Sequence, residues 1–149
     1  MMLFTAGLGT LFLPTGMTKN GNSAALGTTY AEVPGWIPEA ARPGSIVVGN
    51  ALIAVGGKAN AVVSASCLVA NSQAAGVVCR LALYRGGSLL HEGLDVTVPA
   101  FGSTTVTVNV SSPATASISD TDPITLRARA GQAGFLTIQG GTSSWVRIT

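Results

Sequence analysis

Apolar and polar side chains alternate with a period of two over most of this chain, and this alternation constrains its fold more than any other feature. In one segment, Val77, Cys79 and Leu81 alternate with neighbours of the opposite phase, and comparable patterns cover 103–111 and 122–130. Successive side chains of a β-strand point to opposite faces, so each segment predicts a strand with one buried and one solvent-facing side. No stretch of ten residues has helical spacing of its apolar positions, which speaks against a helical bundle.

Turn residues, mainly glycine, proline and asparagine, separate these alternating segments at short intervals. Many short strands with regular turns are typical of a closed pair of sheets. We therefore predict an all-β fold, an antiparallel β-sandwich of the jelly-roll type with about eight strands. The predicted strands are 28–36, 46–55, 60–70, 76–85, 88–98, 103–111, 122–130 and 134–149, the last of them a hairpin.

The first 18 residues contain no charged side chain and several large apolar ones. The apolar run is too short to span a bilayer and lacks the basic start of a secretory signal. Three explanations stay open: an apolar arm docked on a neighbouring chain, a native start at Met17, and a signal or anchor. We favour the arm, and divide the chain into an arm (1–18) that leaves its own sandwich and a β-sandwich domain (19–149). The expected contact residues of the arm are Leu3, Phe4, Leu8, Leu11, Phe12 and Leu13.

Charged residues make up only 9% of the chain, and the formal net charge is +2. An average soluble protein has about 25% charged residues. The balanced charge speaks against nucleic acid as a partner. A surface this poor in charge protects a monomer weakly against association, so a homo-oligomer is expected, with a trimer as one arrangement.

Residues with catalytic or metal-binding chemistry are few. His91 is the single histidine, and Asp95 lies more than about 12 Å further along the same predicted strand. A Ser-His-Asp triad requires direct contact, and no Gly-x-Ser-x-Gly turn is present. Asp120 and Asp122 are typical of a turn rather than of a calcium loop. We therefore expect no enzymatic activity, no cofactor and no metal.

Four arginines fall on the polar phase of their strands, which would allow them to share one outer face within about 5–10 Å of each other. Such a face would suit an acidic partner or a glycan. The alternative, which we favour, is a solvated face with scattered charges. Nucleic acid is expected still less, because aromatic platforms are missing beside these arginines. The four are Arg80, Arg127, Arg129 and Arg147.

The two cysteines, Cys67 and Cys79, are symmetric about Gln73 in the sequence. A simple hairpin around that turn would place them opposite each other on the apolar side of two paired strands. We therefore predict two buried, reduced thiols in contact, within a hairpin register that brings their Cα atoms closer than about 7 Å.

Short structural motifs give the chain a family resemblance. They are Thr28–Trp36 (with Tyr30 and Val33-Pro34-Gly35-Trp36), Pro43-Gly44-Ser45, Gly49–Leu52 and Gly141–Thr149. From about Thr18 to its end, the chain resembles the small β-rich virion proteins of phages that infect actinobacteria, often called minor tail proteins. The resemblance implies a compact antiparallel sandwich, similar to the complement and tumour-necrosis-factor jelly rolls, located in the virion with other virion proteins as partners. It supplies no catalytic residues.

The expected function is thus that of a non-enzymatic structural protein of a phage virion, a minor tail protein acting through assembly contacts. One alternative is a capsid (head) decoration protein. Another is a carbohydrate-binding sandwich for host attachment, with Trp36, Tyr84 or Trp145 as platforms for sugar rings. Exposure of these aromatic side chains distinguishes the glycan alternative from the others, because a platform must be accessible.

Overall fold

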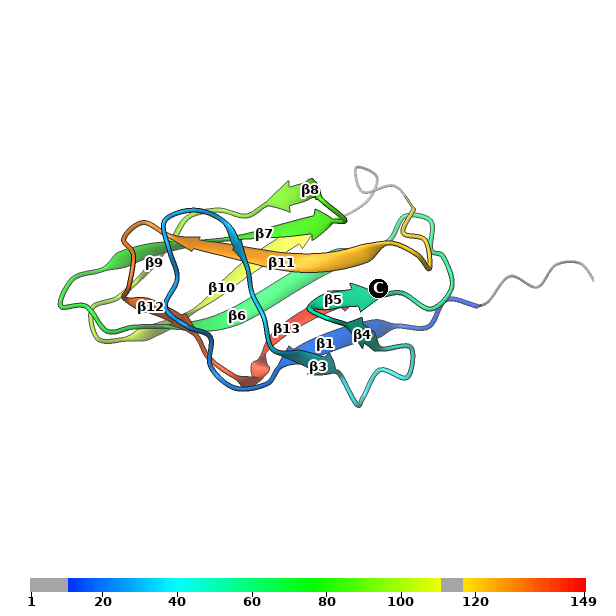
Figure 1. Cartoon of the computed structure of the whole chain (residues 1–149), viewed down its shortest axis with the longest axis horizontal. Helices are drawn as coiled ribbons and strands as arrows, with labels where there is room; N and C mark the ends of the chain where they lie inside the picture. Colours follow the sequence, from blue (N-terminus) through cyan, green and yellow to red (C-terminus); the bar gives the residue numbers. More distant parts are fainter. Residues whose placement is uncertain (1–10, 111–116) are drawn as a thin grey trace, which may run out of the picture.

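Two antiparallel β-sheets pack face to face in the computed structural model, which describes residues 11–110 and 117–149 (Figure 1). No helix occurs in those residues. The expected all-β sandwich is therefore confirmed, but the described part of the chain forms thirteen strands instead of about eight. In Figure 1 the long strands of both sheets run along the long axis, with short strands and loops at the two ends.

The first sheet, sheet A, has the order β10-β6-β13-β1-β3, and β12 also pairs with β6. The second, sheet B, has the order β4-β5-β11-β7-β8, with β2 beside β11 and β9 beside β7. Sheet A consists of β1 (Thr15–Lys19), β3 (Trp36–Pro38), β6 (Val63–Asn71), β10 (Ser103–Val110), β12 (Leu136–Ile138) and β13 (Gly141–Ile148). Sheet B consists of β2 (Ala31–Glu32), β4 (Ile46–Val48), β5 (Ala51–Ile53), β7 (Val77–Arg85), β8 (Ser88–Glu92), β9 (Val96–Val98) and β11 (Pro123–Ala130).

The apolar phase of each long strand faces the other sheet, as the alternation requires. Side chains from β6, β13, β7 and β11 form one continuous core between the sheets. Fully buried examples are Val63, Ile148, Leu81 and Leu126. Burying one such side chain contributes roughly 1.5–3 kcal/mol, so this core is the main source of stability.

Glycine positions explain most of the additional strands. The expected strand 28–36 is interrupted at Gly35 (φ 82°), and the expected strand 46–55 turns back at Gly49 (φ 61°) to give the β4–β5 hairpin. The expected strand 88–98 is divided at Gly93, where a Cβ would lie 3.1 Å from the Leu81 carbonyl oxygen. Alternation detects strands, but it does not show where a chain bends within an alternating segment.

The predicted boundary between arm and domain at residue 18 is wrong. Strand β1 lies inside its own sandwich, between β13 and β3, and Met17 is fully buried. Thr15 is also buried, and its hydroxyl donates to the Gly44 carbonyl 3.0 Å away. The domain therefore includes the last part of the expected arm.

Of the expected arm contacts, Phe12 packs against the core of its own chain. Leu13 approaches the backbone at Gly44, and its N–H donates to Val55. Leu11 is 79% exposed. The remaining three expected contacts, Leu3, Phe4 and Leu8, lie outside the described residues.

The predicted hairpin between the cysteine strands is also wrong. Strand β6 belongs to sheet A and β7 to sheet B, because residues 72–76 cross from one sheet to the other. Cys67 pairs with Val106 and Cys79 with Ala130, so the cysteines lie on facing sheets. Both are free and buried, as expected. Burial raises the pKa of both thiols, that of Cys79 to about 12.

Candidate functional surfaces

The two outer faces of the sandwich differ in their charge. Partners in a β-ladder point to the same side of the sheet. On the outside of sheet A, one row of partners crosses all five strands: Thr107, Ser66, Trp145, Thr18 and Ile37. None of these five side chains is ionisable, and three of them are small hydroxyl residues.

The rows on either side continue this composition. Among the outward-facing strand residues of sheet A that the structure describes, Arg147 is the one charged side chain. The others are small or uncharged: Gly16, Thr18, Ile37, Ser64, Ser66, Leu68, Ala70, Ser103, Thr105, Thr107, Asn109, Thr137, Ser143 and Trp145. We call this surface the sheet A face.

Arg147 has its charge compensated. Its guanidinium donates to both carboxylate oxygens of Glu39, at 2.6 and 3.0 Å, and Glu39 also pairs with Arg42 at 3.2 Å. The same guanidinium lies 4.2 Å from the centre of the Trp145 ring and covers it. Gly16, the β1 partner of Arg147, makes this arrangement fit, since a Cβ there would collide with the Glu39 carboxylate.

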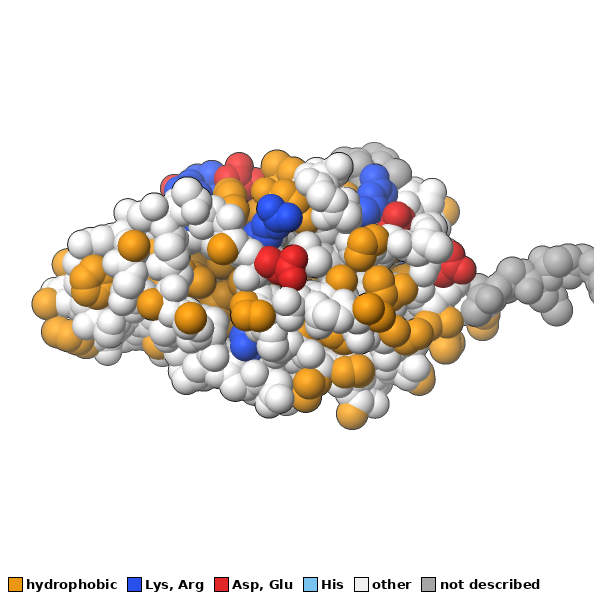
Figure 2. Space-filling view, in the orientation of Figure 1, with side chains coloured by type: hydrophobic (Ala, Val, Ile, Leu, Met, Phe, Trp, Pro, Cys, Tyr) orange, Lys and Arg blue, Asp and Glu red, His pale blue; other side chains and the backbone are white. Residues whose placement is uncertain are grey.

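The outer face of sheet B has the opposite character. Arg80 and Arg129 are direct partners across β7 and β11, and Arg127 follows on β11. Three of the four arginines thus share a face, as the alternation predicted, whereas Arg147 lies on the other sheet. Alternation fixes the phase of a side chain within its strand but not the sheet to which the strand belongs. In Figure 2 blue and red atoms gather along the upper edge, over β7 and β8.

Acidic groups of the same chain neutralise two of these arginines, Arg80 and Arg129. Arg80 pairs with Asp95 at 2.7 Å and with Glu92 at 3.1 Å, and Arg129 lies 4.0 Å from Asp95. Hydrogen bonds from Arg80 lower the pKa of Asp95, while those from Tyr30 and Arg80 lower that of Glu92. Because acidic side chains of the same chain already balance these positive charges, the structure favours the hypothesis of a solvated face over that of a contact with an acidic partner.

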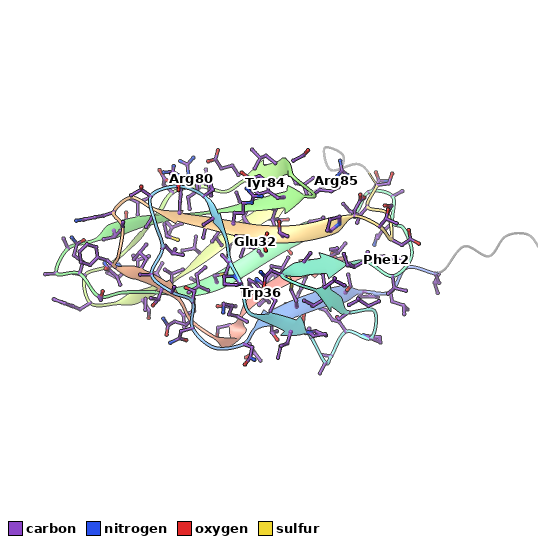
Figure 3. The ribbon with its side chains drawn as sticks, viewed as in Figure 1. Phe12, Glu32, Trp36, Arg80, Tyr84 and Arg85 are labelled. Atoms are coloured by element: carbon purple, nitrogen blue, oxygen red, sulfur yellow. The ribbon has the colours of Figure 1, made fainter. Side chains whose placement is uncertain are left out.

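Two of the three expected sugar platforms are covered, and the third is buried. Trp36 is 5% exposed and donates its indole N–H to the Val33 carbonyl. The guanidinium of Arg127 lies 4.1 Å from the centre of the Tyr84 ring, and Trp145 is covered by Arg147. Figure 3 shows Tyr84 and Arg80 along the upper side of the sandwich, with Trp36 below them.

A different aromatic side chain, Phe101, is exposed. It is 73% accessible, in the turn between β9 and β10, and its φ is 50°. This left-handed conformation costs an L-residue other than glycine roughly 1–2 kcal/mol. This segment falls between the expected strands 88–98 and 103–111, where the sequence indicated only a turn. The signal that could have marked it is a bulky ring at a position where glycine is the usual residue.

The groups with catalytic or metal-binding chemistry are dispersed. His91 is exposed on β8 opposite Leu83, and Asp95 is engaged by Arg80. Asp122 accepts a hydrogen bond from the Ser119 N–H, which is turn geometry. Within 11–110 and 117–149, no three His, Cys, Asp or Glu side chains are grouped to hold a metal, and no helix is long and apolar enough to cross a membrane.

Comparisons with known proteins identify the fold. No family model and no curated protein sequence matches the chain. Among solved structures, Eiger TNF from S. frugiperda has a TM-score of 0.57 at 12% identity, over 92% of this chain and 90% of the other. Murine APRIL at pH 5.0 has a TM-score of 0.56 at 11% identity, over 93% and 98%. This chain therefore has a jelly roll similar to that of the tumour necrosis factors.

Proposed function

We propose that this chain is a non-enzymatic structural protein of a phage virion, a minor tail protein displayed on the particle, and that it associates through the sheet A face. The family resemblance of the Val33–Trp36 block and of the C-terminal segment suggests the virion. The observation that carries the assembly role is the sheet A face itself, with its single, compensated charge.

Depletion of charge at the centre of a patch distinguishes interfaces from ordinary surface. Sheet A has five strands in its main path, and β13 and β10 are eight residues long. With strands about 4.8 Å apart and a rise of about 3.3 Å per residue, the face measures roughly 600 Å². A standard interface buries about 800 Å² per partner, so the face and its rim suffice for one. A second copy of the chain or another virion protein would fit this neutral surface.

A charge placed on the face tests the assembly role. Thr107→Arg puts an unpaired guanidinium on an exposed position at the centre of β10. Thr97→Arg, at an exposed position of β9 on the other sheet, is the matched control. We expect analytical ultracentrifugation to show a homo-oligomer for the wild type and for Thr97→Arg, and a shift toward monomer for Thr107→Arg. Equal masses for the two variants would contradict an assembly role of the face.

The position in the particle needs a separate measurement. Cryo-electron microscopy of the native particle, with the fold located in the density, would place the protein on the tail. Density for the fold on the head would instead support a capsid decoration protein. Density on neither would refute the virion assignment as a whole.

A further inference from the structure

Three loops meet at one end of the sandwich and carry no ionisable side chain. They are residues 72–76, 99–102 and 131–135, which connect β6 to β7, β9 to β10 and β11 to β12. We call this end the distal tip. Figure 2 shows the left end of the molecule in orange and white only, while the blue and red groups lie further right.

Hydrogen bonds join the three loops into one unit. The Asn71 side chain is 5% exposed, and its Nδ2 donates to the carbonyls of Ala75, Val98 and Pro99. The Ser72 N–H donates to the Phe135 carbonyl at 3.0 Å. A tip held in this way is already formed before any ligand arrives, which lowers the entropic cost of binding.

Hydrogen bonds fix the backbone of Phe101 within this unit, but its side chain does not pack in the core. The Phe101 N–H donates to the Gln73 carbonyl at 3.0 Å, and the turn that contains it is closed by the Gly102 N–H, which donates to the Pro99 carbonyl at 3.0 Å. The ring is exposed while the backbone has a positive φ, so folding gains little from the aromatic side chain and would gain from a glycine. Strain of this kind, retained at an exposed position, indicates a use outside the folded chain.

Amide side chains on two of the three loops match this use. The Gln73 Nε2 donates to the Gln132 Oε1 at 2.7 Å, across two loops. This hydrogen bond is exposed, and it uses one N–H of the Gln73 amide and none of the Gln132 amide. The remaining N–H groups are therefore available to donate to ligand hydroxyls.

We propose that the distal tip binds a neutral saccharide, with one sugar ring packed on Phe101 and its hydroxyls hydrogen-bonded by Gln73 and Gln132. Sugar rings present C–H groups that pack on aromatic faces, together with hydroxyls that require partners. A lipid surface fits less well, because one large apolar residue without neighbouring cations anchors a protein weakly. A dry apolar pocket of a protein would leave the remaining N–H groups of Gln73 and Gln132 without acceptors. The proposal is independent of assembly through the sheet A face.

The test is a titration of the ¹⁵N-labelled full chain with cellohexaose, maltohexaose, chitohexaose and mannohexaose, followed by NMR. At least one of them is expected to shift, saturably, the backbone amides of Phe101 and Gly102 and the side-chain amides of Gln73 and Gln132. Phe101→Asn removes the ring but tolerates a positive φ. It is expected to weaken binding at least tenfold while its melting temperature stays at or above that of the wild type.

Matched variants define the outcomes. Phe101→Tyr keeps a ring and is expected to bind, and Val48→Ala, which truncates another exposed apolar side chain on β4, is expected to bind like the wild type. The proposal is overturned if none of the four saccharides shifts the tip, or if Phe101→Asn binds as well as the wild type. It is also overturned if the tip responds only to phosphatidylcholine vesicles or to protein concentration, which would indicate a membrane or a second copy.

Discussion

Truncation of Met17 measures how much strand β1 contributes to the sandwich. The side chain is fully buried, and its residue pairs with Val146 on β13 and with Pro38 on β3. Replacing a buried methionine by alanine loses the transfer free energy of the removed atoms and leaves a cavity, at a cost of about 2–5 kcal/mol. The total free energy of unfolding of a domain is roughly 5–15 kcal/mol, so Met17→Ala removes a large fraction of it.

Urea unfolding followed by tryptophan fluorescence is the appropriate assay, because one of the two tryptophans, Trp36, is buried. A loss of about 3 kcal/mol corresponds to a decrease of about 6–12 °C in melting temperature for a chain of this size. The control is Leu11→Ala, because Leu11 is 79% exposed and its loss is expected to change stability by no more than about 0.5 kcal/mol. Equal stabilities of the two variants would show that β1 does not belong to the core.

Two further predictions concern ionisable groups. Cys67 and Cys79 are expected to resist a thiol reagent at pH 8 in the native protein and to react once urea unfolds it, because with a pKa of about 12 the thiolate fraction of Cys79 is about one in ten thousand. Rapid labelling of the native chain would contradict this burial. Arg80→Gln is expected to raise the pKa of Asp95 toward its ordinary value, measured by NMR titration of the carboxyl carbon. Because the fold lowers that pKa, the pair stabilises the protein above the ordinary pKa of aspartate and loses this contribution as the pH falls; an unchanged titration in the variant would refute the pairing.

The alternation of side chains was sufficient to predict the long strands. Strands β7 and β11 occupy 77–85 and 123–130, within a residue of the expected 76–85 and 122–130. Their burial follows from local sequence alone, because one face of each strand is apolar. The sheet to which each strand belongs depends on the path of its connections. This is why the cysteine hairpin and the position of Arg147 could not be predicted.

Strand β1 was missed for a different reason. Its sequence, Thr-Gly-Met-Thr-Lys, has one large apolar residue and no alternation. Four of its five residues are buried nevertheless, since β3, β13 and the segment at Gly44 cover it. Burial that comes from distant segments leaves little trace in local sequence. The residues that we propose to bind a saccharide at the distal tip were missed similarly, because only the fold brings Gln73, Phe101 and Gln132 together.

The position of β13 has a consequence for biosynthesis. This strand lies between β6 and β1 in sheet A, and both of these neighbouring strands precede it by more than sixty residues in the sequence. On the ribosome, β1 and β6 emerge long before the strand that joins them, so sheet A stays open until residues 141–148 have left the exit tunnel. Until then, the edges of β1 and β6 that pair with β13 have unpaired backbone N–H and C=O groups. Such distant pairing slows folding and exposes strand edges to aggregation, so nascent chains of this protein are expected to depend on chaperones until translation passes β13.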